Sequence, residues 1–149
     1  MKLTQTIEFY IKKTSLALSR MYNELAKKYG LTQTAGYVLM YVHKEGTPTT
    51  QLAYSLGMKE SSLTRLLKKM ENKGLINRIK DPTDKRIIRV FLTPEGVEKR
   101  RLIKKYVLEF NEKIMKNLGE ENIQKFYEIL DYINEMIQKQ VVYQTTIKH

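Results

Sequence analysis

The sequence contains no cysteine, no tryptophan and only two histidines among 149 residues. The absence of cysteine excludes a disulfide framework, a thiolate metal site and a cysteine redox sensor. His43 and His149 are too few for a histidine-rich metal centre. We therefore expect neither a metal nor a cofactor.

Signatures of catalysis are missing as well. The chain has no thiol nucleophile and no glycine-rich phosphate loop, because its seven glycines are scattered as helix stops. No pair of carboxylates shares an apolar face. His43 stands at the expected end of a helix, where its charge suits the helix C-terminus. We predict no catalytic residues and no enzymatic activity.

Long hydrophobic runs are also absent. No stretch approaches the roughly 18 apolar residues that cross a bilayer. The N-terminus lacks the apolar core and the cleavage site of a signal peptide. The balance of 42% hydrophobic and 29% charged residues is that of a globular domain. We expect one soluble, cytoplasmic protein with no membrane partner.

What the chain has in excess is positive charge. Its formal net charge is +11, and residues 59–93 alone carry ten basic and four acidic side chains. More than half of the excess therefore lies in less than a quarter of the chain. This concentration favours a polyanionic partner, nucleic acid above all, over a uniformly solvated lysine-rich surface.

Apolar residues recur at intervals of three and four in six segments, which predicts six helices and a mainly α fold. The first helix runs from Leu3 to just before Gly30, and Thr32 caps the second. Towards the end of the chain, Thr93 caps the fifth helix and Gly119 separates it from the sixth.

The middle of the chain combines two short helices with a change of period. The first of them ends at Gly57, and the second directs four apolar side chains inward: Leu63, Leu66, Leu67 and Met70. Residues 75–80 and 86–93 then alternate apolar and polar side chains, which predicts a two-stranded β-hairpin. Helix, turn, helix and hairpin together make a winged helix-turn-helix.

The outward face of the second short helix suits a DNA groove. An α-helix fits the major groove, where Arg65 can bind a guanine with two hydrogen bonds. Lysines further along the helix, including Lys73, suit phosphates. The alternative is a solvated helix face without a ligand. The predicted DNA-binding residues of the helix and the hairpin turn are Ser61, Ser62, Thr64, Arg65, Lys68, Lys69, Lys85 and Arg86.

Two aspartates, Asp81 and Asp84, stand in the strongly basic hairpin turn. Asp81 precedes a proline and can accept backbone hydrogen bonds in a turn, and Asp84 can pair with the guanidinium group of Arg86. We predict that both aspartates orient the wing rather than contact DNA, leaving Lys85 to enter or flank the minor groove. The alternative is a hydrophilic turn with no ligand.

The segments "LTQTAGYVLMYV" and "MENKGLINRIKDPTDKRIIRVFLTPEG", with the order of the flanking helices, resemble the MarR family of transcriptional regulators over nearly the whole chain. The resemblance implies a homodimeric repressor that binds near-palindromic operator DNA sequence-specifically and is often released by a small ligand. Within the single chain 1–149 it implies a DNA-binding lobe at 32–93 and a helical dimerisation lobe at 1–30 and 94–140. Two residues depart from the family pattern, Lys59 in place of a capping aspartate and Lys85 in place of a wing arginine.

The apolar stripes of the three long helices also predict a dimer. A winged helix of this size cannot cover all three, so we expect them to pack on a second copy across a two-fold axis. The alternative is a monomer with a self-contained helical cap. The expected interface residues are Ile7, Tyr10, Phe110, Ile114, Phe126, Leu130 and Ile133.

The resemblance also implies an effector site between the dimer helices and the DNA-binding lobe. Ten tyrosines suit a small aromatic or phenolic effector, although tyrosine is ordinary packing material too. The candidate residues, for which core or interface packing is the alternative, are Arg20, Tyr37, Met40, Tyr41 and His43.

Two other binding functions compete with double-stranded DNA. A winged helix can be a protein-interaction module that does not bind DNA, which calls for exposed apolar residues in place of Arg65, Lys68 and Lys69. RNA binding calls for aromatic stacking residues, and residues 59–86 contain none. Duplex DNA is therefore the predicted partner.

Overall fold

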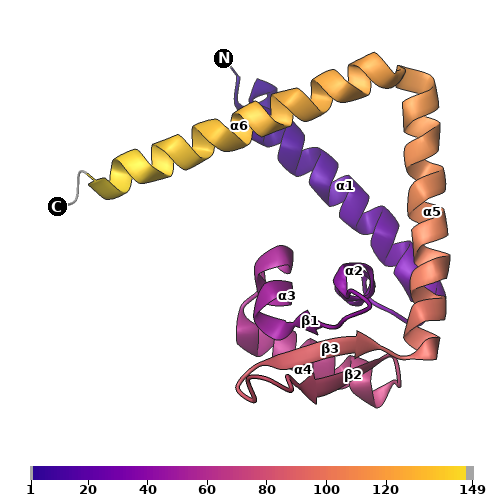
Figure 1. The fold of residues 1–149 in the computed structure, drawn as a ribbon. Coiled ribbons are helices and arrows are strands. Elements are labelled where there is room, and N and C mark those ends of the chain that lie inside the picture. Colours follow the sequence, from indigo (N-terminus) through magenta and orange to yellow (C-terminus); the bar gives the residue numbers. More distant parts are fainter. Residues whose placement is uncertain (1, 147–149) are drawn as a thin grey trace. The chain divides into compact units, whose positions relative to one another are not determined.

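Over residues 2–146, the part that the structure describes, the computed structural model contains six α-helices, a 3₁₀ turn and a three-stranded sheet (Figure 1). Side chains are described as far as residue 141. The chain divides into two compact units, Met1–Lys105 and Tyr106–His149, and the division falls inside α5. The predicted fold class, mainly α with a winged helix-turn-helix, is confirmed, whereas the predicted lobe boundaries stay a prediction.

The helices and strands have the following bounds. The helices are α1 (Ile7–Lys28), α2 (Gln33–Tyr41), α3 (Thr49–Leu56), α4 (Glu60–Asn72), α5 (Pro94–Leu118) and α6 (Glu120–Thr146). The strands are β1 (Thr47–Pro48), β2 (Ile76–Lys80) and β3 (Ile88–Leu92), which lie in the antiparallel order β1-β3-β2.

Short polar side chains begin two helices where the sequence predicted them. The hydroxyl of Thr32 accepts a hydrogen bond from the backbone N–H of Ala35 (3.2 Å) and caps α2. The hydroxyl of Thr93 does the same for α5 through the N–H of Gly96 (3.1 Å). At the other end of a helix, Gly57 terminates α3 in the left-handed conformation, with φ at 59°.

The start of α1 differs from the prediction. The side chain of Thr6 caps the helix by accepting from the N–H of Phe9 (3.3 Å), so that α1 begins at Ile7. Leu3, predicted as the first residue of the apolar stripe, lies instead in the 3₁₀ turn Leu3–Gln5 and is 86% exposed. Periodicity gave no boundary here, because the spacing of Leu3 and Ile7 also fits a continuous helix.

The sheet has one more strand than the predicted hairpin. β2 and β3 pair as expected, with Ile76 opposite Leu92 and Arg78 opposite Val90. β1, which the sequence indicated only as a break between helices, pairs with the other edge of β3, and Thr47 lies opposite Val90. A strand of two residues is too short to show an alternation of apolar and polar side chains, so periodicity could not find it.

The core of the first unit is formed by α2, α3, α4 and the inner face of the sheet. Its apolar side chains with at most 2% exposure are Val38, Leu39, Val42, Leu52, Leu63, Leu67, Met70, Ile76 and Val90. Burial of a side chain of this size contributes roughly 1.5–3 kcal/mol. Three of the four apolar residues predicted to face inward from α4 are in this core, whereas Leu66 is half-buried.

In the second unit, Ile123 is 7% exposed. Many of the large apolar side chains of this unit are in contrast exposed: Tyr106, Leu108, Met115, Leu118, Phe126, Tyr127, Ile129, Tyr132, Met136, Ile137 and Val141. Over residues 2–146, no helix combines the length and the apolar character needed to cross a membrane. The described helices of this unit thus expose many large apolar side chains, although none of these helices is long and apolar enough to cross a membrane.

Candidate nucleic-acid interface

The outward face of α4 carries the polar and cationic side chains that were predicted to contact DNA. Seven of the eight predicted DNA-binding residues are exposed: Ser61, Thr64, Arg65, Lys68 and Lys69 on α4, and Lys85 and Arg86 in the hairpin turn. The eighth, Ser62, is half-buried. None of the exposed large apolar side chains of the described residues belongs to α4. The surface of α4 is therefore polar and positively charged.

A lysine lies at each end of α4, Lys59 at the N-terminal end and Lys73 at the C-terminal end. Lys59 is the N-cap residue, and its side chain makes no capping hydrogen bond, a loss that typically costs about 1 kcal/mol. Glu60 in the first turn instead places a negative charge at the positive end of the helix dipole. Beyond the C-terminal end, the ammonium group of Lys73 donates to the carbonyl oxygen of Gly30 (2.9 Å) and ties α4 to the turn before α2.

An ion pair joins α4 to the hairpin. Both carboxylate oxygens of Glu71 accept from Arg78 on β2: Oε1 from the backbone N–H (3.2 Å), and Oε2 from Nε (3.1 Å) and Nη2 (2.6 Å). The hydrogen bonds from the Arg78 side chain hold the pKa of Glu71 below its usual value. The helix and the wing are therefore linked by a side-chain fork as well as by the apolar core.

Asp81 organises the hairpin turn from inside. The residue is only 5% exposed. Its Oδ1 accepts from the N–H (2.8 Å) and the hydroxyl (2.6 Å) of Thr83 and from the N–H of Asp84 (3.1 Å), while Oδ2 accepts from Nε of Arg89. The hydroxyl of Thr83 and then the guanidinium group of Arg89 hold the pKa of Asp81 well below its usual range. An aspartate thus builds the turn of a basic wing.

Arg89 extends this network beyond the wing. Its Nη1 donates to the carbonyl oxygen of Gly46 (3.2 Å), in the linker between α2 and β1. Gly46 has a φ of 78°, and a Cβ atom at this position would overlap the ring of Phe91. Sequence reasoning gave Arg89 no role. The pairing of Arg89 with Asp81 depends on the strand register, which places Arg89 opposite Ile79. This register could not be determined from the sequence.

Asp84 forms a fork with Arg86. Oδ1 of Asp84 accepts from the backbone N–H (3.0 Å) and Nε (3.1 Å) of Arg86, and Oδ2 accepts from Nη2 (3.0 Å). This pair lowers the pKa of Asp84 and raises that of Arg86. The side chain of Arg86 nevertheless remains 90% exposed. The structure therefore presents Arg86 to solvent in a held orientation, and Lys85 is exposed beside it.

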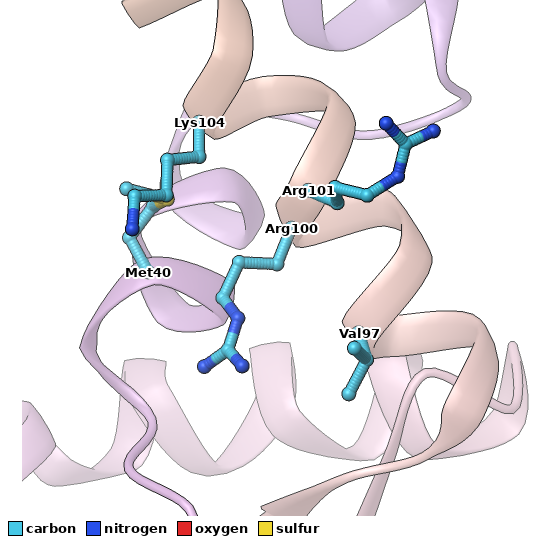
Figure 2. Close-up of a pocket in the computed structure, with 5 residues that line it drawn as sticks. All are labelled: Met40, Val97, Arg100, Arg101 and Lys104. Atoms are coloured by element: carbon cyan, nitrogen blue, oxygen red, sulfur yellow. The ribbon is translucent and has the colours of Figure 1, made fainter. Parts of the chain in front are cut away.

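One of the predicted effector residues, Met40, lines a cavity within the described part of the chain. Met40 lines an open cavity together with residues of α5 (Figure 2), and Arg20, Tyr37, Tyr41 and His43 are not among the residues that line it. These four side chains are exposed, and the hydroxyl of Tyr37 accepts from Nε2 of Gln33 (3.1 Å). Their role as an effector site stays a prediction.

The predicted dimer residues are all incompletely buried in the single chain. Ile7, Tyr10 and Phe126 are 59%, 58% and 53% exposed. The remaining four are half-buried: Phe110, Ile114, Leu130 and Ile133. Their assignment to an interface stays a prediction.

Comparison with known proteins identifies the segment that contains this interface. Residues 31–88 match the model of the MarR family. The matched segment covers α2, α3, α4 and β2 and ends at the first residue of β3. Over these residues the chain is similar to the MarR family. The resemblance stated from the sequence is thereby confirmed.

Two relatives show how far this MarR-family similarity extends. The chain is 40% identical to the HTH-type transcriptional regulator YhbI of Bacillus subtilis (strain 168) over 76 residues, which are 50% of this chain and 47% of YhbI. It is 29% identical to the HTH-type transcriptional regulator SarZ of Staphylococcus haemolyticus (strain JCSC1435) over 103 residues, 68% of this chain and 70% of SarZ. The chain thus spans about half the length of the first relative. Both names describe regulators and neither describes an enzyme, which agrees with the prediction that the chain is not an enzyme.

A solved structure shows the same fold over a longer part of the chain. The crystal structure of a complex of S. aureus MepR with DNA has a TM-score of 0.79, covers 88% of this chain and 98% of MepR, and is 20% identical in sequence. At this level of identity the likeness establishes the fold. The winged helix-turn-helix and its flanking helices are therefore a known architecture.

We predict that Asp81→Asn destabilises the chain and weakens the pH dependence of its stability. The folded-state pKa of Asp81 is depressed from an unfolded value near 4, so its carboxylate stabilises the fold above about pH 5, and this contribution is lost as the pH falls towards the folded-state pKa. The difference in free energy of unfolding between wild type and variant should be constant from about pH 7 to 5 and shrink below about pH 4. Urea denaturation followed by circular dichroism measures it.

Asp131→Asn makes the same change in net charge at an exposed position on α6 and is the control. A difference between wild type and Asp81→Asn that is as large at about pH 3 as at pH 7 would show that ionisation of Asp81 does not stabilise the turn.

Proposed function

We propose that the chain is a transcriptional regulator that binds double-stranded DNA sequence-specifically as a homodimer and represses from near-palindromic operators. The observation that carries this proposal is the division of α4 into two faces. Leu63, Leu67 and Met70 are buried, so the cationic side chains opposite them face solvent on a helix of a size that fits the major groove. The MepR structure supports the proposal, because a protein of the same fold is found there in a complex with DNA.

Residues along α4 take different parts in this proposal. Arg65 lies in the N-terminal half of the helix and binds a base edge, with Ser61, Ser62 and Thr64 hydrogen-bonding to bases or phosphates beside it. Lys68 and Lys69 follow in the C-terminal half and contact phosphates, which position the protein without reading sequence. All except the half-buried Ser62 are exposed in the free chain.

In the wing, we propose that Arg86 enters the minor groove and Lys85 flanks it. The side chain of Arg86 is 90% exposed and is held by Asp84 through a bidentate pair. Because its orientation is already fixed, Arg86 loses less conformational entropy on binding DNA than a free side chain does. Asp81 supports the turn through Arg89 and Thr83. Both aspartates act on DNA binding through the shape of the wing.

The exposed apolar side chains support the dimer. Ile7 and Tyr10 on α1 and Phe126 on α6 are more than half exposed in the single chain. Each large side chain covered by a second copy would contribute roughly 1.5–3 kcal/mol, which favours association of the long helices. A two-fold axis would then place the two α4 helices about one turn of DNA apart, roughly 34 Å. We further propose that a small effector alters this spacing by binding one arrangement more tightly, and that the protein is cytoplasmic.

The protein-interaction alternative is not favoured by the surface. Exposed large apolar side chains do occur near α4, namely Tyr54 on α3 and Ile79 and Ile87 on the hairpin. On α4 itself, however, the exposed positions are polar or charged. A protein partner with an apolar binding surface would find no matching side chain on this helix.

We predict that Arg65→Ala weakens binding to a duplex selected from genomic DNA about 5- to 150-fold and reduces discrimination against unrelated duplexes, because a base-edge contact is worth roughly 1–3 kcal/mol. Lys68→Ala should weaken binding to all duplexes alike and lower the slope of affinity against salt concentration by about one. Fluorescence anisotropy at two salt concentrations measures both effects.

Lys113→Ala removes the same charge from an exposed position on α5 and serves as the control. Equal affinity of the wild type for the duplex and for its separated strands, or no binding to any duplex at low salt, would contradict the proposed function.

Asp84→Ala gives a test in which two explanations predict opposite signs. If charge alone decides affinity, removing a carboxylate near DNA should strengthen binding. If Asp84 orients Arg86, the loss of the fork should weaken binding to the selected duplex, although the protein becomes more positive. We expect weaker binding, about two- to tenfold, as for the loss of one charge-assisted hydrogen bond at an exposed site. Unchanged or tighter binding in the anisotropy assay would remove the orienting role.

A further inference from the structure

The linker between α2 and β1, residues 42–46, is held at both ends by arginines from other elements of the first compact unit. At its start, Nη1 of Arg100 on α5 donates to the carbonyl oxygen of Val42 (3.0 Å). This carbonyl lies at the C-terminal end of α2, where carbonyl groups lack partners within the helix and a positive charge is favourable. At the end of the linker, Nη1 of Arg89 on β3 donates to the carbonyl oxygen of Gly46 (3.2 Å). One short segment thus connects α5 to the sheet.

The linker itself is tightly folded, so its two ends do not move independently. The backbone N–H of His43 donates to the hydroxyl of Thr47 (2.9 Å), and the N–H of Gly46 donates to the carbonyl oxygen of His43 (3.1 Å). Thr47 is 1% exposed. Gly46 lies so close to the ring of Phe91 that an added Cβ atom would overlap it. A shift of the linker at its α5 end is therefore passed on to Gly46.

From Gly46 the contacts continue into the turn of the wing. Arg89, which binds the carbonyl oxygen of Gly46 through Nη1, also donates from Nε to Oδ2 of Asp81. Oδ1 of Asp81 accepts from the N–H of Asp84 (3.1 Å), and the carboxylate of Asp84 holds the guanidinium group of Arg86. Hydrogen bonds and one short stretch of backbone therefore connect α5 to the exposed cation of the wing.

We propose that Arg100 is a positioning residue for the wing, which fixes the linker and through it the orientation of Arg86. Arg100 makes none of the proposed contacts with DNA. It is half-buried, and a charge-assisted hydrogen bond in such surroundings is screened less by water and salt than one at the surface. The consequence for DNA affinity rests on the proposed function, whereas the effect on the wing of the free chain does not.

The neighbouring Arg101 provides a matched control on the same helix. Figure 2 shows the guanidinium groups of Arg100 and Arg101 pointing in opposite directions from α5. Arg101 donates to the carboxylate of Glu98 on α5 itself, from Nε (2.9 Å) and from Nη2 (2.7 Å). Arg100→Met and Arg101→Met therefore remove the same charge from the same part of α5, and Arg100→Met alone releases the linker.

Hydrogen exchange of the free chain, followed by NMR without DNA, tests the effect on the wing. The reporters are N–H groups of the wing turn that donate to a carboxylate, those of Thr83, Asp84 and Arg86. In Arg100→Met they should exchange about two- to tenfold faster than in the wild type, as for the loss of one hydrogen bond, while the N–H of the buried Leu67 on α4 is unchanged. Arg101→Met should leave all of them unchanged. Arg100→Lys keeps a donor for the carbonyl oxygen of Val42 and should restore the exchange of the wild type.

Fluorescence anisotropy with a duplex selected from genomic DNA tests the consequence for binding. Arg100→Met should weaken binding about two- to tenfold more than Arg101→Met does. Because Arg100 acts through Arg86, this difference should disappear when both changes are made in an Arg86→Ala background. A general loss of stability would instead weaken binding in either background.

Three results would overturn the proposal. They are equal exchange of the wing-turn N–H groups in Arg100→Met and Arg101→Met, equal acceleration of these groups and of Leu67, and a difference in DNA affinity that persists in the Arg86→Ala background. A wild type that binds no duplex would contradict the proposed function, and hydrogen exchange of the free chain would still decide whether Arg100 positions the wing.

Discussion

The rotation of α4 about its own axis is fixed by three side chains, Leu63, Leu67 and Met70, which are at most 2% exposed. A rotation of α4 that buried Arg65 would expose these three residues, which would cost roughly 1.5–3 kcal/mol for each of them. It would also bury an unpaired guanidinium charge, which is costlier still. The core therefore determines which side chains the solvent, and any ligand, can reach. Every proposed contact of α4 with DNA depends on this constraint.

The wing depends on acidic side chains in a basic segment. Glu71 binds the hairpin to α4 through Arg78, and Asp81 binds the turn to β3 through Arg89. Because Arg89 also donates to Gly46, the wing is tied to the linker that follows α2. Carboxylates in this region thus act inside the structure, where they set the positions of strands and turn, and the exposed cations remain at the surface.

Sequence reasoning was sufficient where one local rule decides the structure. The caps at Thr32 and Thr93 need only a hydroxyl before a helix, and the inward face of α4 needs only a period of 3.6 residues. It failed where the partner is distant or the element is very short. The pairing of Arg89 with Asp81 depends on the strand register. Strand β1 has only two residues. The cavity beside Arg100 forms only when α5 packs on the end of α2. None of these leaves a periodic trace in the sequence.

The central claim, that two copies place α4 and the wing on consecutive turns of one duplex, is tested most directly by hydroxyl-radical footprinting on a selected operator. The account predicts two symmetry-related protected segments whose centres lie about one helical turn, roughly 34 Å, apart. It also predicts that Arg86→Ala removes the protection at the outer, minor-groove end of each segment while the rest of each segment remains protected. A single protected segment, or protection without two-fold symmetry, would contradict the account.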